Sequence, residues 1–130
     1  MCYTRRALIG AAIGAGLLRA EAATSRELVA AAFAMRDKAV AAGDQPYGAI
    51  VARDGAIVGW GPSRVRELGE WVGHAEREAM RDAQRRIGED LSGCVMVSTS
   101  RPCGSCQRTA AQARLSRMYY GADATDAGKP

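Results

Sequence analysis

The sequence lacks repeats and low-complexity tracts, and it contains only four prolines among 130 residues. These absences argue against a fibrous or disordered chain and against a second domain. The apolar run at residues 7–18 is too short to span a bilayer comfortably, so we expect no stable membrane span. With 48% hydrophobic residues, the chain is long enough to bury one core and is expected to form one globular domain.

An excess of charge of one sign is also missing. The formal net charge is +4, and part of it lies in the first 22 residues, where Arg5, Arg6 and Arg19 outnumber Glu21. The rest of the chain carries 15 basic and 13 acidic side chains. A balance this even does not favour a nucleic acid as the partner.

Residues 1–22 have the pattern of an export signal. Arg5 and Arg6 precede the apolar run, and Ala20-Glu21-Ala22 follows it as a cleavage site of the A-x-A type. The paired arginines indicate the twin-arginine variant. We therefore predict a twin-arginine signal segment at 1–22, a single domain at 23–130 and a periplasmic or secreted location. The alternative is a cytoplasmic protein in which residues 1–22 form the first amphipathic helix of the domain.

Local signals predict seven elements in the remaining chain. Thr24 and Glu27 form a capping box that begins a helix, and Asp54-Gly55 is a strong hairpin turn signal. We expect, in chain order, a helix at 25–42, strands at 47–53 and 56–61, a loop at 62–72, a helix at 74–87, a strand at 95–99, a helix from 102 to 114, a strand at 117–121 and a polar tail at 123–130. This order predicts an α/β fold, a three-layer α/β/α sandwich with a mixed sheet that is mostly parallel apart from its first hairpin.

One imidazole, two thiols and one carboxylate have the spacing of a catalytic zinc site. His74 opens the second predicted helix with Glu76 two residues later, and Cys103 and Cys106 open the third. Three protein ligands leave a fourth zinc position for water, and a neighbouring carboxylate can move its protons. We predict that His74, Cys103 and Cys106 bind Zn²⁺ and that Glu76 is catalytic. Taken singly, His74 could be structural and the two cysteines a redox dithiol, while Cys94 is expected in the core.

The zinc motifs and several other segments together match the sequence pattern of a known family. His-x-Glu followed by Pro-Cys-x-x-Cys is the signature of zinc deaminases that act on nucleobases. With these motifs the chain resembles the cytidine deaminase-like superfamily, in particular its CMP/dCMP-type branch of tRNA adenosine, guanine and small cytosine deaminases. The resemblance covers residues 25 to 126, and its other matching segments are Pro46-Tyr47-Gly48-Ala49-Ile50, Gly59-Trp60-Gly61, Ser92-Gly93-Cys94 and Tyr120-Gly121-Ala122.

The resemblance implies a hydrolytic deaminase of a nucleobase or nucleoside. In that mechanism zinc-bound hydroxide attacks the amidine carbon of the base, Glu76 shuttles the proton, and ammonia leaves. The family pattern places substrate contacts at Gly48, Ala49, Ser63, Ala75 and Pro102. We expect a small-molecule base or nucleoside rather than a tRNA, because export and the modest charge both argue against a tRNA. Relatives are commonly dimers, so the resemblance also implies a homodimer.

Several positions depart from the family pattern. Ser63 stands where the branch usually has a base-binding Asn, Arg101 where a Glu is common, and Trp71 where a Pro is common. We expect Trp71 in a lid, in the core or stacked on the substrate. Relatives usually add a fifth strand and closing helices, so the fold is expected to be C-terminally short. Two alternatives stay open: a catalytically degraded, zinc-folded binding module, favoured by Ser63, and a thiol oxidoreductase that uses Cys103 and Cys106.

Overall fold

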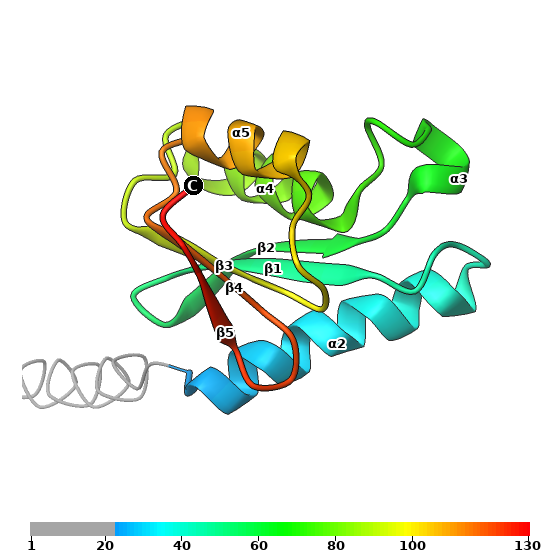
Figure 1. Cartoon of the computed structure of the whole chain (residues 1–130), viewed down its shortest axis with the longest axis horizontal. Helices are drawn as coiled ribbons and strands as arrows, with labels where there is room; N and C mark the ends of the chain where they lie inside the picture. The colour runs from blue at the N-terminus through cyan, green and yellow to red at the C-terminus, as the bar shows by residue number, and fades with distance from the viewer. Residues whose placement is uncertain (1–22) are drawn as a thin grey trace, which may run out of the picture.

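The computed structural model of the chain describes residues 23–130, and the predicted signal segment at residues 1–22 lies outside the described residues. The described elements are, in chain order, α2 (Ser25–Ala41), β1 (Gly48–Arg53), β2 (Ala56–Pro62), α3 (Val65–Leu68), α4 (Ala75–Ile87), β3 (Cys94–Ser98), α5 (Gly104–Gln112), β4 (Arg117–Tyr120) and β5 (Thr125–Gly128) (Figure 1). Among these helices, none has both the length and the apolar character that crossing a membrane requires.

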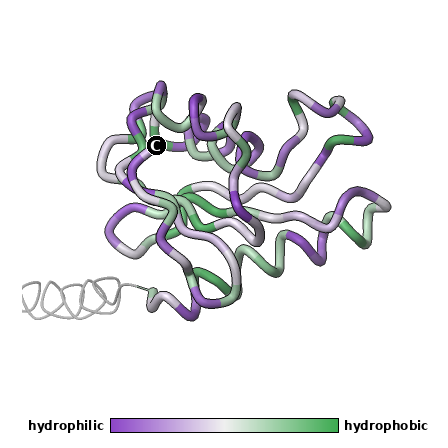
Figure 2. Tube along the Cα trace, in the orientation of Figure 1, coloured by the Kyte–Doolittle hydropathy of each residue, from purple (hydrophilic) through white to green (hydrophobic). Residues whose placement is uncertain are grey.

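One sheet separates two helical layers. Helix α2 lies against one face of the sheet, and α4 and α5 lie against the other face (Figure 1). The predicted three-layer α/β/α sandwich is therefore confirmed. Figure 2 shows hydrophobic residues along the central strands and hydrophilic residues along many of the turns, as expected when one sheet is buried between two layers.

The strand order of the sheet is β2-β1-β3-β4-β5. Strand β1 pairs antiparallel with both β2 and β3, β4 pairs antiparallel with β5, and only the β3–β4 pair is parallel. The sheet is mixed, as predicted, but the prediction that it is mostly parallel is wrong. Strands β2 and β3 do run in the same direction, as the helical crossover between them requires. The hairpin strand β1 lies between them, and this makes both of its pairings antiparallel.

A fifth strand follows β4, where the sequence suggested a polar tail at 123–130. Gly121 and Ala124 have φ angles of 79° and 49°, and these left-handed conformations turn the chain back beside β4. Arg117 and Asp126 then form an ion pair of 2.9 Å between the two strands. The expectation that the chain lacks a fifth strand is therefore wrong. A short, exposed edge strand has no alternating apolar pattern from which it can be predicted.

The local signals produce the structures that they predict. The backbone amide of Glu27 donates to the Thr24 hydroxyl over 3.2 Å, and the Thr24 amide donates to the Glu27 carboxylate over 2.8 Å. Asp54 and Gly55 both have positive φ angles, 54° and 78°, as the tight turn between β1 and β2 requires. The predicted loop at 62–72 contains one unexpected element, the single-turn helix α3.

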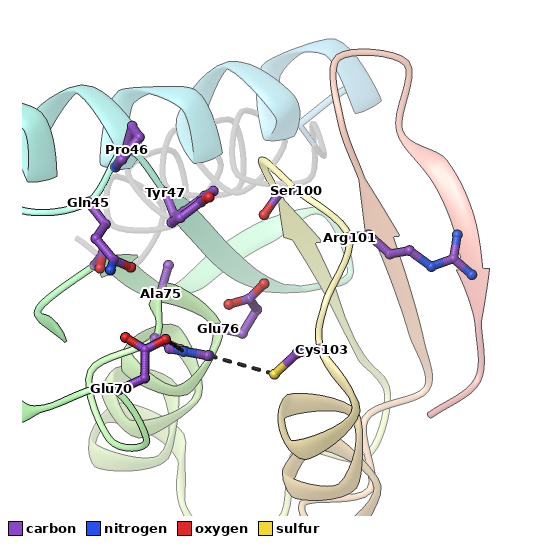
Figure 3. Close-up of a pocket in the computed structure, with 11 residues that line it drawn as sticks. Gln45, Pro46, Tyr47, Glu70, Ala75, Glu76, Ser100, Arg101 and Cys103 are labelled. Carbon is purple, nitrogen blue, oxygen red and sulfur yellow. Dashed lines mark hydrogen bonds and ion pairs between the residues drawn. The ribbon is translucent and has the colours of Figure 1, made fainter.

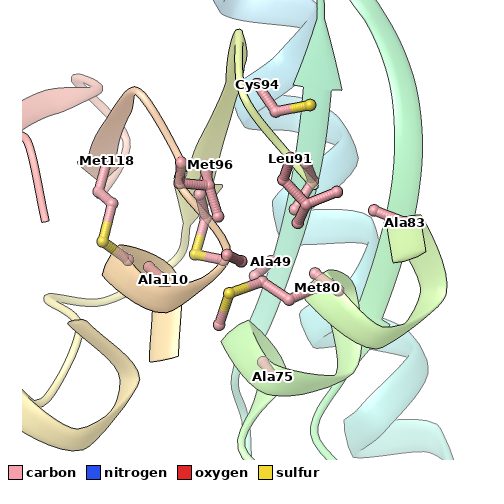
Figure 4. Close-up of a cluster of buried hydrophobic side chains, with 13 residues drawn as sticks. Ala49, Ala75, Met80, Ala83, Leu91, Cys94, Met96, Ala110 and Met118 are labelled. Atoms are coloured by element: carbon pink, nitrogen blue, oxygen red, sulfur yellow. The ribbon is translucent and has the colours of Figure 1, made fainter. Parts of the chain in front are cut away.

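Two hydrophobic cores hold the helices to the sheet. The larger core lies between the sheet and the α4–α5 layer, and it includes Met80, Leu91, Met96 and Met118 (Figure 4). Cys94 is fully buried in it, which confirms the prediction that this cysteine is a core residue. The smaller core joins α2 to the opposite face of the sheet through Ala32, Ile50, Ala52 and Val97. Both helical layers are thus fixed relative to the strand ends.

Glycines in β2 let α4 approach the sheet closely. A Cβ atom on Gly61 would lie 2.2 Å from the carbonyl oxygen of Ala75, and one on Gly59 would lie 2.3 Å from the carbonyl oxygen of Ala79. Real Cβ atoms do not approach backbone oxygens this closely, because interiors are already packed to high density. The absence of side chains at these two positions therefore sets where the first turn of α4 lies.

We expect Gly61→Ala to lower the free energy of unfolding by about 1 to 3 kcal/mol, because the added methyl group forces α4 away from the sheet. Urea denaturation followed by circular dichroism measures the change. Gly104→Ala is the matched control, since its Cβ atom would meet nothing closer than an Arg108 nitrogen at 3.6 Å. Equal stability of the two variants would contradict the proposed close packing.

We expect Asp82→Asn to lower stability at neutral pH and to weaken the dependence of stability on acid. Burial by itself would raise the pKa of Asp82, but hydrogen bonds from the Trp60 amide and Arg86, each 3.0 Å long, outweigh burial and lower this pKa. The carboxylate therefore stabilises the fold above its unfolded-state pKa of about 3.9. This contribution is lost as the pH falls through the lower folded-state pKa. Denaturation at several pH values measures it, with the exposed Asp123→Asn as control; a parallel loss in both variants would refute the assignment.

Candidate metal centre and its pocket

Three potential metal ligands meet at the beginnings of two helices. His74 immediately precedes α4, Cys103 is the N-cap of α5, and Cys106 lies in the first turn of α5. The Nδ1 atom of His74 lies 3.4 Å from the Cys106 sulfur and 3.7 Å from the Cys103 sulfur, and the second contact is dashed in Figure 3. All three donor atoms lie within 4.8 Å of one another. The structure thus brings together the three residues that the sequence suggests as ligands.

The donor set fits a tetrahedral zinc ion. Zinc bonds of about 2.3 Å to sulfur and about 2.0 Å to nitrogen place neighbouring N and S donors about 3.5 Å apart. The two observed nitrogen-to-sulfur distances lie on either side of this value. A site with three protein donors also leaves one position open, which is the arrangement of catalytic rather than structural zinc.

The two thiols have opposite electrostatic environments. Burial by itself would raise the pKa of Cys103, but hydrogen bonds from the Ser105 hydroxyl and the Cys106 amide help to lower it to about 6. Burial raises the pKa of Cys106, and with the negative charge of Glu76 and contact with Cys103 this pKa reaches about 12. Cys103 is therefore a thiolate at neutral pH, whereas Cys106 must lose a proton when a metal ion binds.

Glu76 lies beside the donor group as a buried carboxylate. Its side chain is 6% exposed, its Oε2 atom accepts a 2.9 Å hydrogen bond from the Ser98 hydroxyl, and its Oε1 atom lies 4.0 Å from the Cys106 sulfur. Burial raises the pKa of Glu76, and the Ser98 hydroxyl partly offsets this rise. Sequence reasoning missed Ser98, because its only signal is a position at the end of a buried strand. The arrangement holds one oxygen in place and leaves the other directed toward the metal ligands.

Glu70 is a second residue that sequence reasoning missed. Its carboxylate lies 3.3 Å from the Nε2 atom of His74, whereas the Nδ1 atom of the same ring faces the sulfurs. Burial by itself would lower the pKa of His74, but contacts with Glu70 and Cys103 raise it. A carboxylate on the outer nitrogen fixes the tautomer of a metal-binding histidine. The one sequence feature that could have indicated this role is the position of Glu70 four residues before His74.

The donor group opens into a cavity of about 450 Å³ between the loop before β1 and the beginnings of α4 and α5 (Figure 3). Its walls are formed by Gln45, Pro46, Tyr47, Ser63, Glu70, His74, Ala75, Glu76, Ser100, Arg101 and Cys103. Cys106 is fully buried behind this surface. The cavity therefore gives solvent and small ligands direct access to His74, Cys103 and Glu76.

Two of the five predicted substrate contacts line this cavity. Ala75 lies beside Glu76 at the beginning of α4. Ser63 is buried, and its hydroxyl donates a 2.9 Å hydrogen bond to the carboxylate of Asp44. The Ser63 hydroxyl is therefore already engaged inside the protein. The roles of both residues in binding a substrate stay predictions.

The other three predicted contacts lie outside the cavity wall. The amide of Gly48 donates to the Thr99 hydroxyl over 3.1 Å, and its carbonyl oxygen accepts from the Thr99 amide over 2.9 Å. Ala49 is fully buried in β1, and Pro102 is buried next to Cys103. Their substrate contacts also stay predictions.

The two other departures from the family pattern have clear positions. Trp71 is 72% exposed, so the option that it packs in the core is wrong, and it does not line the cavity. Arg101 does line the cavity, but its guanidinium group donates a 2.9 Å hydrogen bond to the hydroxyl of Tyr120. Figure 3 shows its side chain directed away from Glu76. Arg101 is therefore held at the rim.

Comparison with known proteins identifies the family of this site. Residues 22–122 match the family model described as the cytidine and deoxycytidylate deaminase zinc-binding region. In sequence, the chain is 33% identical over 85 residues to the guanine deaminase of Bacillus subtilis, a match that covers 65% of this chain and 54% of the relative. It is 39% identical over 99 residues to the tRNA(Ile)-lysidine synthase of Deinococcus radiodurans, covering 75% of this chain and 17% of that protein.

Solved structures agree with these matches. The crystal structure of the Bacillus subtilis guanine deaminase has a TM-score of 0.71 at 29% identity, over 76% of this chain and 64% of that one. A structure from work on A-to-I editing by tRNA:A34 deaminases has a TM-score of 0.67 at 31% identity, over 72% of both chains. The chain spans only about half the length of the curated guanine deaminase that it matches.

We expect Glu70→Gln to weaken zinc binding by about tenfold to a hundredfold, because an amide orients the histidine less firmly than a carboxylate does. Competition with a chromogenic chelator measures the zinc dissociation constant. Glu67→Gln is the matched control, since Glu67 pairs with Arg64 on the same segment and does not contact His74. Equal zinc affinity of the two variants would show that Glu70 does not orient the ligand.

Proposed function

The chain belongs to the cytidine and deoxycytidylate deaminase zinc-binding family, and from this membership we propose that it removes the exocyclic amine of a nucleobase or nucleoside by hydrolysis. The observation that carries the proposal is the buried carboxylate of Glu76 beside a His/Cys/Cys donor group. A carboxylate in this position suits a proton shuttle. The reaction adds water to the amidine carbon and releases ammonia, so one C–O bond forms and one C–N bond breaks.

His74, Cys103 and Cys106 would hold the zinc ion. When bound, zinc supplies a Lewis acid that lowers the pKa of water at its open position toward about 7. Two thiolates and a neutral imidazole balance the charge of the ion. His74 and Cys103 line the cavity while Cys106 is buried behind it, so the accessible side of the donor group faces the space available to a substrate.

Glu76 would move the protons. Its Oε2 atom is held by the Ser98 hydroxyl, so its Oε1 atom, which is directed toward the donor group, would accept a proton from the attacking water. The same oxygen then delivers that proton to a ring nitrogen and assists the departure of ammonia. Burial raises the pKa of Glu76, which favours its protonated form and so suits its second role as an acid.

A small molecule is the substrate class that we propose. The cavity of about 450 Å³ is in the range of sites that enclose small ligands. The nearly even charge of residues 23–130 does not favour a tRNA as the substrate. Similarity to a guanine deaminase supports a purine base among the candidates. Export from the cytoplasm and homodimer formation stay predictions from the sequence.

One observation favours the alternative of a binding module without catalysis. The Ser63 hydroxyl donates its proton to Asp44, so the side chain at position 63 has no donor left for a base in the cavity. The thiol oxidoreductase alternative is weaker, because it gives no role to His74, whose ring contacts both sulfurs. An ammonia-release screen of zinc-loaded protein on bases, nucleosides and nucleotides separates the deaminase from the two alternatives, and an insulin-reductase assay then separates the oxidoreductase from the binding module.

We expect Glu76→Gln to lower kcat by about a hundredfold or more while the protein keeps one zinc ion per chain, because the amide cannot accept the proton. Ammonia release and elemental analysis measure the two quantities. Glu89→Gln, at an exposed position outside the cavity, is the control and should keep full activity. Full activity of the Glu76→Gln variant would refute the mechanism.

A further inference from the structure

Most polar side chains on the cavity wall already have a function or a partner among the described residues. Those with one are His74, Cys103, Glu70, Glu76, Ser63 and Arg101. Three lining residues with polar side chains are left: Gln45, Tyr47 and Ser100. These three side chains have no hydrogen-bond partner among the described residues, so their whole hydrogen-bonding capacity is available to a substrate in this cavity.

Gln45 differs from the other two in the groups it offers. Tyr47 and Ser100 each carry one hydroxyl group, and Tyr47 is 43% exposed. A carboxamide presents two N–H donors and one carbonyl acceptor in a fixed plane. Gln45 is the only carboxamide on the described wall, and no hydrogen bond within residues 23–130 uses its side chain.

The backbone of Gln45 is firmly held. Its amide donates to the Asp44 carboxylate over 2.8 Å, and its carbonyl oxygen accepts from the Tyr47 amide over 2.8 Å. The same Asp44 oxygen accepts from the Ser63 hydroxyl over 2.9 Å and from the Val65 amide over 3.1 Å. Asp44 therefore ties the loop that carries Gln45 to the segment after β2. This fixed backbone places the carboxamide on the cavity wall.

Figure 3 shows the side chain of Gln45 extending from the loop before β1 toward the side of the cavity where Glu70 and Ala75 lie. We propose that Gln45 is the specificity-determining residue that recognises the hydrogen-bonding edge of the base, an inference that rests on the proposed deaminase function. The chemical class it fits is a heterocycle with a donor and an acceptor on neighbouring atoms, as in a lactam or an aminopyrimidine edge. Ser63 then has a supporting role, because its hydroxyl holds Asp44 rather than the base.

Two measurements on zinc-loaded full chains test this inference. The first is kcat and KM for every base or nucleoside from which the wild-type protein releases ammonia. The second is calorimetric binding of guanine, adenine and cytosine to the Glu76→Gln variant, which requires no turnover. Gln45→Ala is compared in both with Gln112→Ala, an exposed glutamine at the end of α5 outside the cavity.

We expect Gln45→Ala to raise KM, and the dissociation constant in the Glu76→Gln background, by about tenfold for the preferred base, since one or two hydrogen bonds are lost. Its kcat, zinc content and melting temperature should stay close to those of the Gln112→Ala control. Gln45→Glu should change the order of preference among the bases, because the carboxylate only accepts. Gln45→Asn should recover part of the affinity. A merely structural residue would alter stability but not the order of preference.

The outcomes separate this inference from the proposed function. If the wild-type protein releases ammonia but Gln45→Ala leaves KM and the dissociation constants unchanged, Gln45 does not recognise the base and the deaminase function stands. If no ammonia is released but Gln45→Ala still weakens base binding, the deaminase function fails and recognition by Gln45 stands. If none of the three bases binds the Glu76→Gln variant, the inference is overturned.

Discussion

The site depends on two helices that begin at the same edge of the sheet. Strands β2, β3 and β4 run in one direction, so α4 begins after β2 and α5 begins after β3 at their shared carboxyl edge. This edge is where α/β sheets generally bind ligands. The separation of 3.4 to 3.7 Å between the His74 nitrogen and the two sulfurs follows from this convergence. Glycines in β2 fix how close α4 comes, and thereby where Glu76 lies.

The ionisable groups at this edge differ in burial and in hydrogen bonding, and their pKa values differ accordingly. Glu76 is buried, and its own backbone amide and the Ser98 hydroxyl only partly offset the effect of burial, so its pKa is raised, which suits a group that transfers protons. Cys103, at the exposed beginning of α5, is stabilised as a thiolate, whereas the buried Cys106 is not. The site thus combines Cys103, which is already a thiolate, with Cys106, which loses its proton when a metal ion binds. Glu76 adds a carboxyl group that can accept a proton and give it back.

Signals confined to a few neighbouring residues predicted the structure well. The capping box at Thr24 and Glu27 and the turn at Asp54-Gly55 were predictable because their hydrogen bonds and φ angles join residues at most three apart. The strand order could not be predicted in this way, because the position of β1 between β2 and β3 does not affect the local sequence pattern. Strand β5 was missed because an exposed edge strand buries too little to need apolar residues.

The sequence by itself determined the chemistry of the centre, since His74, Glu76, Cys103 and Cys106 are recognisable by residue type and spacing. Only the tertiary structure decided which groups surround them. The contacts of Ser98 with Glu76 and of Ser63 with Asp44 join residues 22 and 19 positions apart. The physical reason is that metal ligation requires particular side chains, whereas orienting and recognising groups need only the right position in space, which packing of the helices on the sheet supplies.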